Sequence, residues 1–67
     1  MKLQILKISL AAARINANLT QGEVAKELHV TKQTIINWEK GRSKPSPAQF
    51  YFMCKLYGVP EDSIILS

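Results

Sequence analysis

Residues 19–42, LTQGEVAKELHVTKQTIINWEKGR, decide the fold of this chain. Thr20 and Glu23 form a capping box, in which the two side chains satisfy free backbone N–H groups at a helix start. A second helix start follows after the two-residue stretch 29–30. So short a connection forces a sharp angle between the two helices, and we predict a helix-turn-helix unit over about residues 20–40.

The other helices are predicted from the same two signals, apolar periodicity and capping. Ahead of the unit, one helix face is expected at Leu6, Leu10, Ala13 and Ala17. Behind it, residues 46–49 form another capping box, with Pro47 at the first helical position where its missing N–H costs nothing. A last short helix is expected over roughly residues 60–66, and no segment indicates a convincing strand. The prediction is an all-α fold, a compact domain of five helices that occupies residues 1–67 as a single unit.

The predicted core collects the apolar residues on the inner faces of these helices. Helix two supplies Val24, Ala25 and Leu28, and the residues expected from the later helices are Ile35, Trp38, Phe50, Met53, Cys54, Tyr57, Ile64 and Ile65. With 67 residues the chain has room for one core and no more.

The charge of the chain favours a polyanionic partner. Nine basic residues stand against five acidic ones, and the segment 31–45 holds four basic residues against Glu39 alone. Such a balance suits nucleic acid or an anionic membrane surface. No stretch approaches the roughly 18 apolar residues that a membrane span needs. We therefore predict a cytoplasmic protein with no membrane partner.

Few residues are available for catalysis or metal binding. The chain has one His, one Asp, four Glu and one Cys, so it has no internal disulfide and no evident structural zinc site. Cys54 is expected in the core, and His29 has no Cys, His or acidic partner at ligand spacing. The sequence predicts no enzyme, no metal, no cofactor and no small-molecule ligand.

A family resemblance is carried by the runs LTQxEVA at residues 19–25 and VTxxTIxxWExGR at residues 30–42. Pro-Ser at 45–46 and Gly-Val at 58–59 continue the same pattern. Together they resemble the Cro/repressor-type (XRE-like) helix-turn-helix family, whose fold is lambda-repressor-like. The resemblance implies that the chain binds operator DNA, usually as a dimer, and regulates transcription.

The second helix of the unit, residues 31–40, is the candidate DNA-reading element. With Ile35 and Trp38 pointing inward, an outer face carries the predicted base contacts Lys32, Gln33 and Asn37, of which Gln33 is favoured most. Amide side chains bond bidentately to adenine, and Lys donates to guanine O6 and N7. The alternative is an ordinary solvated helix face. Ile36 is either peripheral core or a contact to a thymine methyl group.

Phosphate contacts are expected from a helix N-terminus and from the basic residues after the recognition helix: Gln21, Lys40, Arg42 and Lys44. The resemblance implies that Gln21 contacts the DNA backbone and can buttress the first residues of the recognition helix. The alternatives are a plain helix-start residue for Gln21 and ordinary solubilising charge for Lys44.

The resemblance also implies structural roles. Arg14 and Glu39 are expected to form an ion pair between the first and third helices. His29 occupies a turn position where the family most often has Gly, and we expect a positive φ there, which His adopts more readily than most residues.

The leading hypothesis is a sequence-specific DNA-binding transcriptional regulator, a small Cro-like repressor that inserts helix 31–40 into the operator major groove. By analogy it would be prokaryotic or phage-encoded, nucleoid-associated, and active in phage or mobile-element control. A homodimer on double-stranded DNA would form through the last helix and the edge of the fourth, where Phe52 is either a dimer contact or half-buried. The alternative is an antitoxin-type module that binds both DNA and a partner protein.

Overall fold

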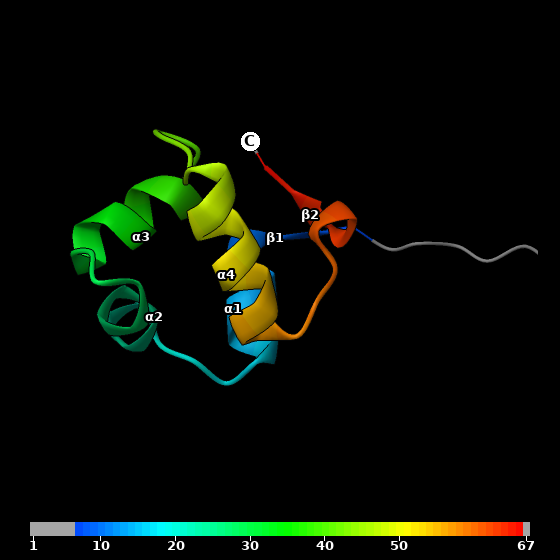
Figure 1. The fold of residues 1–67 in the computed structure, drawn as a ribbon, viewed down its shortest axis with the longest axis horizontal. Helices are drawn as coiled ribbons and strands as arrows, with labels where there is room; N and C mark the ends of the chain where they lie inside the picture. The colour runs from blue at the N-terminus through cyan, green and yellow to red at the C-terminus, as the bar shows by residue number, and fades with distance from the viewer. Residues whose placement is uncertain (1–6, 67) are drawn as a thin grey trace, which may run out of the picture.

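The structure is a computed structural model that describes residues 7–66. In this part of the chain, four α-helices lie between two very short strands (Figure 1). The elements are β1 (Ile8–Ser9), α1 (Leu10–Asn16), α2 (Gln21–Leu28), α3 (Lys32–Glu39), α4 (Pro47–Tyr57), the 3-10 turn η1 (Glu61–Ser63) and β2 (Ile64–Ile65). In Figure 1, α2 and α3 lie on the opposite side of α4 from the strands.

Capping residues set where the helices begin. Each of the four α-helices follows a Ser or Thr whose hydroxyl accepts a hydrogen bond from the backbone N–H of the third helical residue: Ser9, Thr20, Thr31 and Ser46. The two predicted capping boxes are complete, since Glu23 and Gln49 each accept a hydrogen bond of 2.8 Å from the cap residue's N–H. Left-handed residues end α2 at His29 and α4 at Gly58.

The buried side chains on the four helices lie on their predicted inner faces, and Ile64 joins them from β2. Within residues 7–66 the buried hydrophobic core consists of Leu10, Ala13, Val24, Ala25, Ile35, Trp38, Met53, Cys54, Tyr57 and Ile64. Leu28 and Phe50 are partly buried against them. Burial raises the pKa of the Cys54 thiol, with a smaller contribution from the negative charge of Glu61. Cys54 therefore remains a neutral, packed side chain.

The predicted fifth helix is wrong. Residues 61–63 make a single 3-10 turn, and β2 then pairs in parallel with β1, with Ile8 opposite Ile64 and Ser9 opposite Ile65. The two adjacent β-branched residues Ile64 and Ile65 favour an extended chain over a helix. The prediction that no segment forms a convincing strand is therefore also wrong.

The strand pairing changes which residues near the end of the chain reach the core. Successive side chains of a strand point to opposite faces, so Ile64 is 7% exposed while Ile65 is 52% exposed. The expectation that both isoleucines are buried is correct for Ile64 only. At the other end of the described chain, β1 ends at Ser9, which caps α1. The position Leu6, which was expected on the helix, lies outside the described residues.

None of the helices within residues 7–66 has the length and apolar character required to cross a membrane.

Alanine substitutions of the two isoleucines test this pairing. Ile64→Ala should lower the free energy of unfolding by about 2–5 kcal/mol because it empties a core position. Ile65→Ala should lower it by less than about 0.5 kcal/mol because the side chain is largely in solvent. Urea denaturation of the two variants measures both values. Equal losses would show that the last residues form a helix or pair in another register.

Candidate nucleic-acid interface

A tight left-handed turn connects α2 to α3. His29 has φ 58° and ψ 40°, and its N–H bonds to the carbonyl of Lys26. The N–H of Val30 bonds to the carbonyl of Ala25 at 3.0 Å, which completes a Schellman-type helix end. The positive φ expected for His29 is confirmed. Since Thr31 already caps the next helix, α2 and α3 meet at a sharp angle (Figure 1).

The inner face of α3 holds this helix against the body of the domain. Ile35 has no exposed surface and Trp38 is 6% exposed. Their burial fixes which side chains of α3 face solvent.

The predicted base contacts lie on the outer side of α3. Lys32 and Gln33 are exposed, and Asn37 is half-buried one turn after Gln33. The side-chain amide of Gln33 donates from Nε2 to Oδ1 of Asn37 at 3.0 Å. Ile36 is half-buried but does not belong to the apolar residues that pack against the core, so part of its side chain is left accessible.

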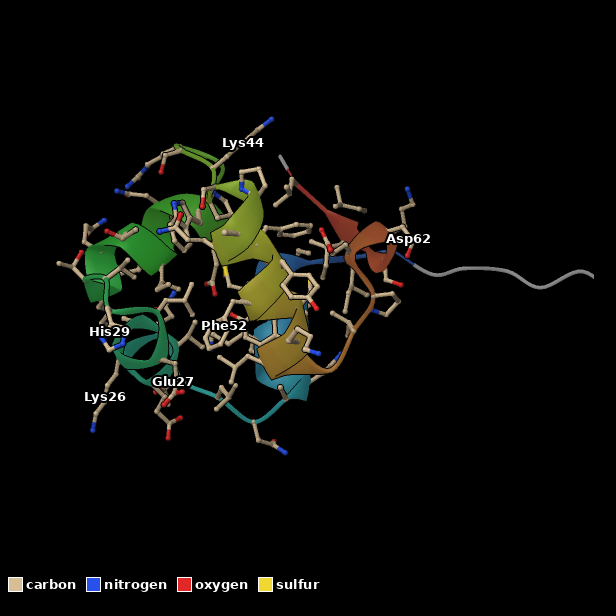
Figure 2. All side chains as sticks on the ribbon, in the orientation of Figure 1. Lys26, Glu27, His29, Lys44, Phe52 and Asp62 are labelled. Atoms are coloured by element: carbon tan, nitrogen blue, oxygen red, sulfur yellow. The ribbon has the colours of Figure 1, made fainter. Side chains whose placement is uncertain are left out.

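The basic residues that follow α3 form an exposed loop. Gly41, with φ 75°, ends the helix, and the N–H of Arg42 bonds to the carbonyl of Asn37 at 2.9 Å. Lys40, Arg42 and Lys44 are all exposed. Figure 2 shows Lys44 pointing away from the body of the molecule.

Ser43 is a member of this loop that sequence reasoning left out. It is exposed between Arg42 and Lys44, and serine hydroxyls are common donors to phosphate oxygens. Its position between two basic residues is the sequence feature that could have indicated a phosphate contact.

A polar network joins α1, α2 and α3 at Glu39. Arg14 Nε donates to Glu39 Oε2 at 2.7 Å, and Gln21 Nε2 donates to Glu39 Oε1 at 2.9 Å. Arg14 Nη1 also donates to the carbonyl of Leu19 at 2.9 Å, in the link between α1 and α2. The side chains of Arg14 and Glu39 are only 13% and 6% exposed, so this ion pair is largely removed from water.

Gln21 contacts a different part of α3 from the one expected. Its amide bonds to the last residue of α3, Glu39, and not to the first residues of that helix. The turn at residues 29–31 places the start of α3 beside the end of α2. The start of α2, where Gln21 lies, is therefore within reach of the far end of α3.

Tyr57 lies buried near this network. Burial, and then the negative charge of Glu39, raise the pKa of its hydroxyl well above the ordinary value. This hydroxyl has no hydrogen-bond partner among the residues that the structure describes. Tyr57 therefore contributes a neutral ring to the core.

No metal-binding cluster is present within residues 7–66: no three His, Cys, Asp or Glu side chains there come together. His29 is exposed at the end of α2, as Figure 2 shows.

Two helices joined by a tight turn, the second with a polar outer face and a basic loop behind it, define a DNA-binding helix-turn-helix domain. The helix-turn-helix family matches residues 10–64, and the chain belongs to this XRE-type family. It is also 39% identical over 61 residues to an uncharacterised HTH-type transcriptional regulator of Methanocaldococcus jannaschii, a match covering 91% of this chain and 92% of that protein. No solved structure matches the chain.

Removal of Glu39 tests the network. Glu39→Ala should lower the free energy of unfolding by about 3–5 kcal/mol because Arg14 is left largely buried without a counter-charge. The matched control is Glu27→Ala, an exposed carboxylate on α2 that should change it by less than about 0.5 kcal/mol. Urea denaturation measures both.

A double variant separates the cost of an unpaired charge from the loss of packing. Arg14→Met combined with Glu39→Leu should recover much of the stability, since apolar replacement of a whole buried pair is often neutral. A double variant that loses the sum of the two single losses would show that the ion pair is not the cause.

Proposed function

We propose that this DNA-binding protein is a sequence-specific transcriptional regulator, a small Cro-like repressor that inserts helix 31–40 into the major groove of its operator. The outer face of α3 carries the proposal, because its polar side chains face solvent while Ile35 and Trp38 anchor the helix from behind. The similarity to an HTH-type transcriptional regulator of M. jannaschii supports the regulatory role.

The chemistry of this face suits recognition of base edges. The Gln33 amide both donates and accepts, which matches N6 and N7 of adenine, and Lys32 can donate to O6 and N7 of guanine. Gln33 is the second residue of α3, and the N-terminal part of a recognition helix approaches the bases. Asn37 is the third member of the proposed base-reading set, and the accessible part of Ile36 suits a thymine methyl group.

Phosphate contacts in this proposal flank the recognition helix. Lys40, Arg42 and Lys44 lie at its end and in the loop behind it. Gln21 lies at the start of α2, where free backbone N–H groups favour an anion. One hydrogen of its Nε2 is engaged by Glu39, so we assign its phosphate contact to the backbone N–H or to the other amide hydrogen.

The proposed functional unit is a homodimer on double-stranded DNA. Strand β2 follows the 3-10 turn where the fifth helix was expected; Ile65 in this strand and Leu66 directly after it are 52% and 36% exposed. Tyr51 on α4 is 53% exposed and is the apolar residue we assign to the α4 edge of the interface. Two copies would then read half-sites about one helical turn of DNA apart. By analogy with the family, the setting is the nucleoid in a prokaryotic cytoplasm, under phage or mobile-element control.

A second candidate function is an antitoxin-type module that also covers a partner protein. It is favoured by a shallow apolar hollow lined by Glu27, Leu28, His29, Ala48, Gln49 and Phe52. Phe52 is 43% exposed, and Figure 2 shows it on α4, on the side that faces α2. No residue of α3 lines this hollow, so a protein bound there would leave α3 free for DNA. Co-purification of a second small chain with a defined stoichiometry distinguishes this candidate.

Salt dependence tests the phosphate contacts. Arg42→Ala and Lys44→Ala should each weaken binding to every DNA sequence alike and flatten the slope of log affinity against log salt by roughly 0.9. Fluorescence anisotropy over a salt series measures the slopes. The control is Lys26→Ala, an exposed lysine on α2 that lies far from Lys44 in Figure 2 and should leave the slope unchanged. Unchanged slopes in both test variants would remove these residues from the interface.

Base readout is tested at Gln33 on an operator selected from random DNA with the wild-type protein. Gln33→Ala should lose about 1–3 kcal/mol of operator binding, while binding to random DNA and the salt slope hardly change. Operators altered one base pair at a time should show relaxed preference at one position in each half-site. Equal weakening on operator and random DNA would make Gln33 a backbone contact. If the wild-type protein selects no operator, the regulator proposal fails.

A further inference from the structure

Gln33 and Asn37 are coupled on the outer face of α3. They are four residues apart, which places them as neighbours on one side of the helix. Gln33 Nε2 donates to Asn37 Oδ1 at 3.0 Å. The amide proposed to read a base is therefore already hydrogen-bonded to a second side chain in the DNA-free protein.

Asn37 is the more firmly held member of the pair. Asn37 is half-buried whereas Gln33 is exposed, and the backbone carbonyl of Asn37, not its side chain, accepts a hydrogen bond of 2.9 Å from the backbone N–H of Arg42. The oxygen that accepts from Gln33 therefore belongs to an anchored residue near the end of α3.

This hydrogen bond is compatible with bidentate recognition of adenine. A Gln amide has two N–H donors and a carbonyl acceptor. Adenine N6 and N7 require one acceptor and one donor from the side chain. Asn37 engages one hydrogen of Gln33 Nε2, so the second hydrogen and Oε1 are both left for the base.

Restricting the Gln33 amide before DNA binds increases the affinity for the base pair that it contacts. Ordering a rotamer-rich side chain at an interface weakens association by a factor of about 2 to 10. A partner on the same helix that restricts Gln33 beforehand removes part of that loss. The gain applies only to the base pair that Gln33 reads.

We infer that Asn37 is a positioning residue for Gln33: its Oδ1 holds the Gln33 amide in the orientation that reads one base pair, and its contribution to specificity passes through Gln33. This rests on the proposed function and refines it, because Asn37 then reads no base pair of its own.

The test is a double-mutant cycle on the selected operator and its single-base-pair variants. Asn37→Ala should lower the preference at the position that Gln33→Ala relaxes, by about 2- to 10-fold, and should leave the other positions unchanged. In the Gln33→Ala background, Asn37→Ala should have no further effect, since the partner through which it acts is gone. Relaxation at a different base pair, or additive losses in the double variant, would overturn the inference.

Asn37→Asp is the conservative variant. It should keep the base preference at the Gln33 position if Asn37 acts through its acceptor oxygen, and should lose it if Asn37 is purely structural or contacts a base directly. Aspartate keeps an acceptor oxygen for Gln33 but has no N–H group and adds a negative charge. Operator and random DNA should therefore be bound more weakly to the same degree, with the preference at the Gln33 position retained. Loss of that preference, as in Asn37→Ala, would contradict the inference.

Asn16→Ala is the matched control, an exposed asparagine on α1 whose replacement should leave every base preference unchanged. Thermal melting of each variant checks that it is folded. The wild-type selection separates the two proposals: failure to select any operator refutes the regulator proposal, whereas a selected operator with additive losses refutes only the role of Asn37.

Discussion

The carboxylate of Glu39 is the point at which three helices are held to one another. One of its oxygens accepts from Arg14 of α1, and the other accepts from Gln21 of α2. Placing this ion pair largely out of water costs about as much free energy as the pairing returns, so its net stabilisation is small. Its effect is on geometry, since any movement of α3 relative to α1 and α2 stretches charged hydrogen bonds that water does not replace.

Apolar packing restrains the same helix from the other side. Ile35 and Trp38 enter the core while Glu39 is tied to the neighbouring helices, so α3 is fixed both in rotation and in tilt. Base contacts depend on both, because a hydrogen bond weakens steeply when its geometry is lost. In the proposed complex the few side chains on the outer face therefore extend from a helix that is held in place. The hydrogen bond to Asn37 restrains the side chain of Gln33 as well.

The features that sequence predicts well are those encoded by near neighbours. The cap residues and the periodic inner faces act within one or two turns of a helix, and they place α2, α3 and α4; for α1 they give the inner face but not its start after Ser9. The Gln33–Asn37 hydrogen bond is also local, because the two residues are four apart on one helix face, but from the sequence only base contacts were expected of them. The β1–β2 pairing was not predictable in this way, because strands of two residues carry no alternating pattern and their partners are distant along the chain. The contact of Gln21 with Glu39 depends in the same way on the angle between two helices.

The parallel pairing of β1 with β2 also has a kinetic consequence. It joins residues from the two ends of the described chain, whereas the helices and their caps form from contacts a few residues apart. Closing so long a loop has a high entropic cost that must be met before its few hydrogen bonds and the burial of Ile64 compensate. The strand pair is therefore expected to form after the helical core during folding and to open before it during unfolding. The amide hydrogens that the strand pair protects should accordingly exchange with solvent through openings that leave α2 and α3 intact.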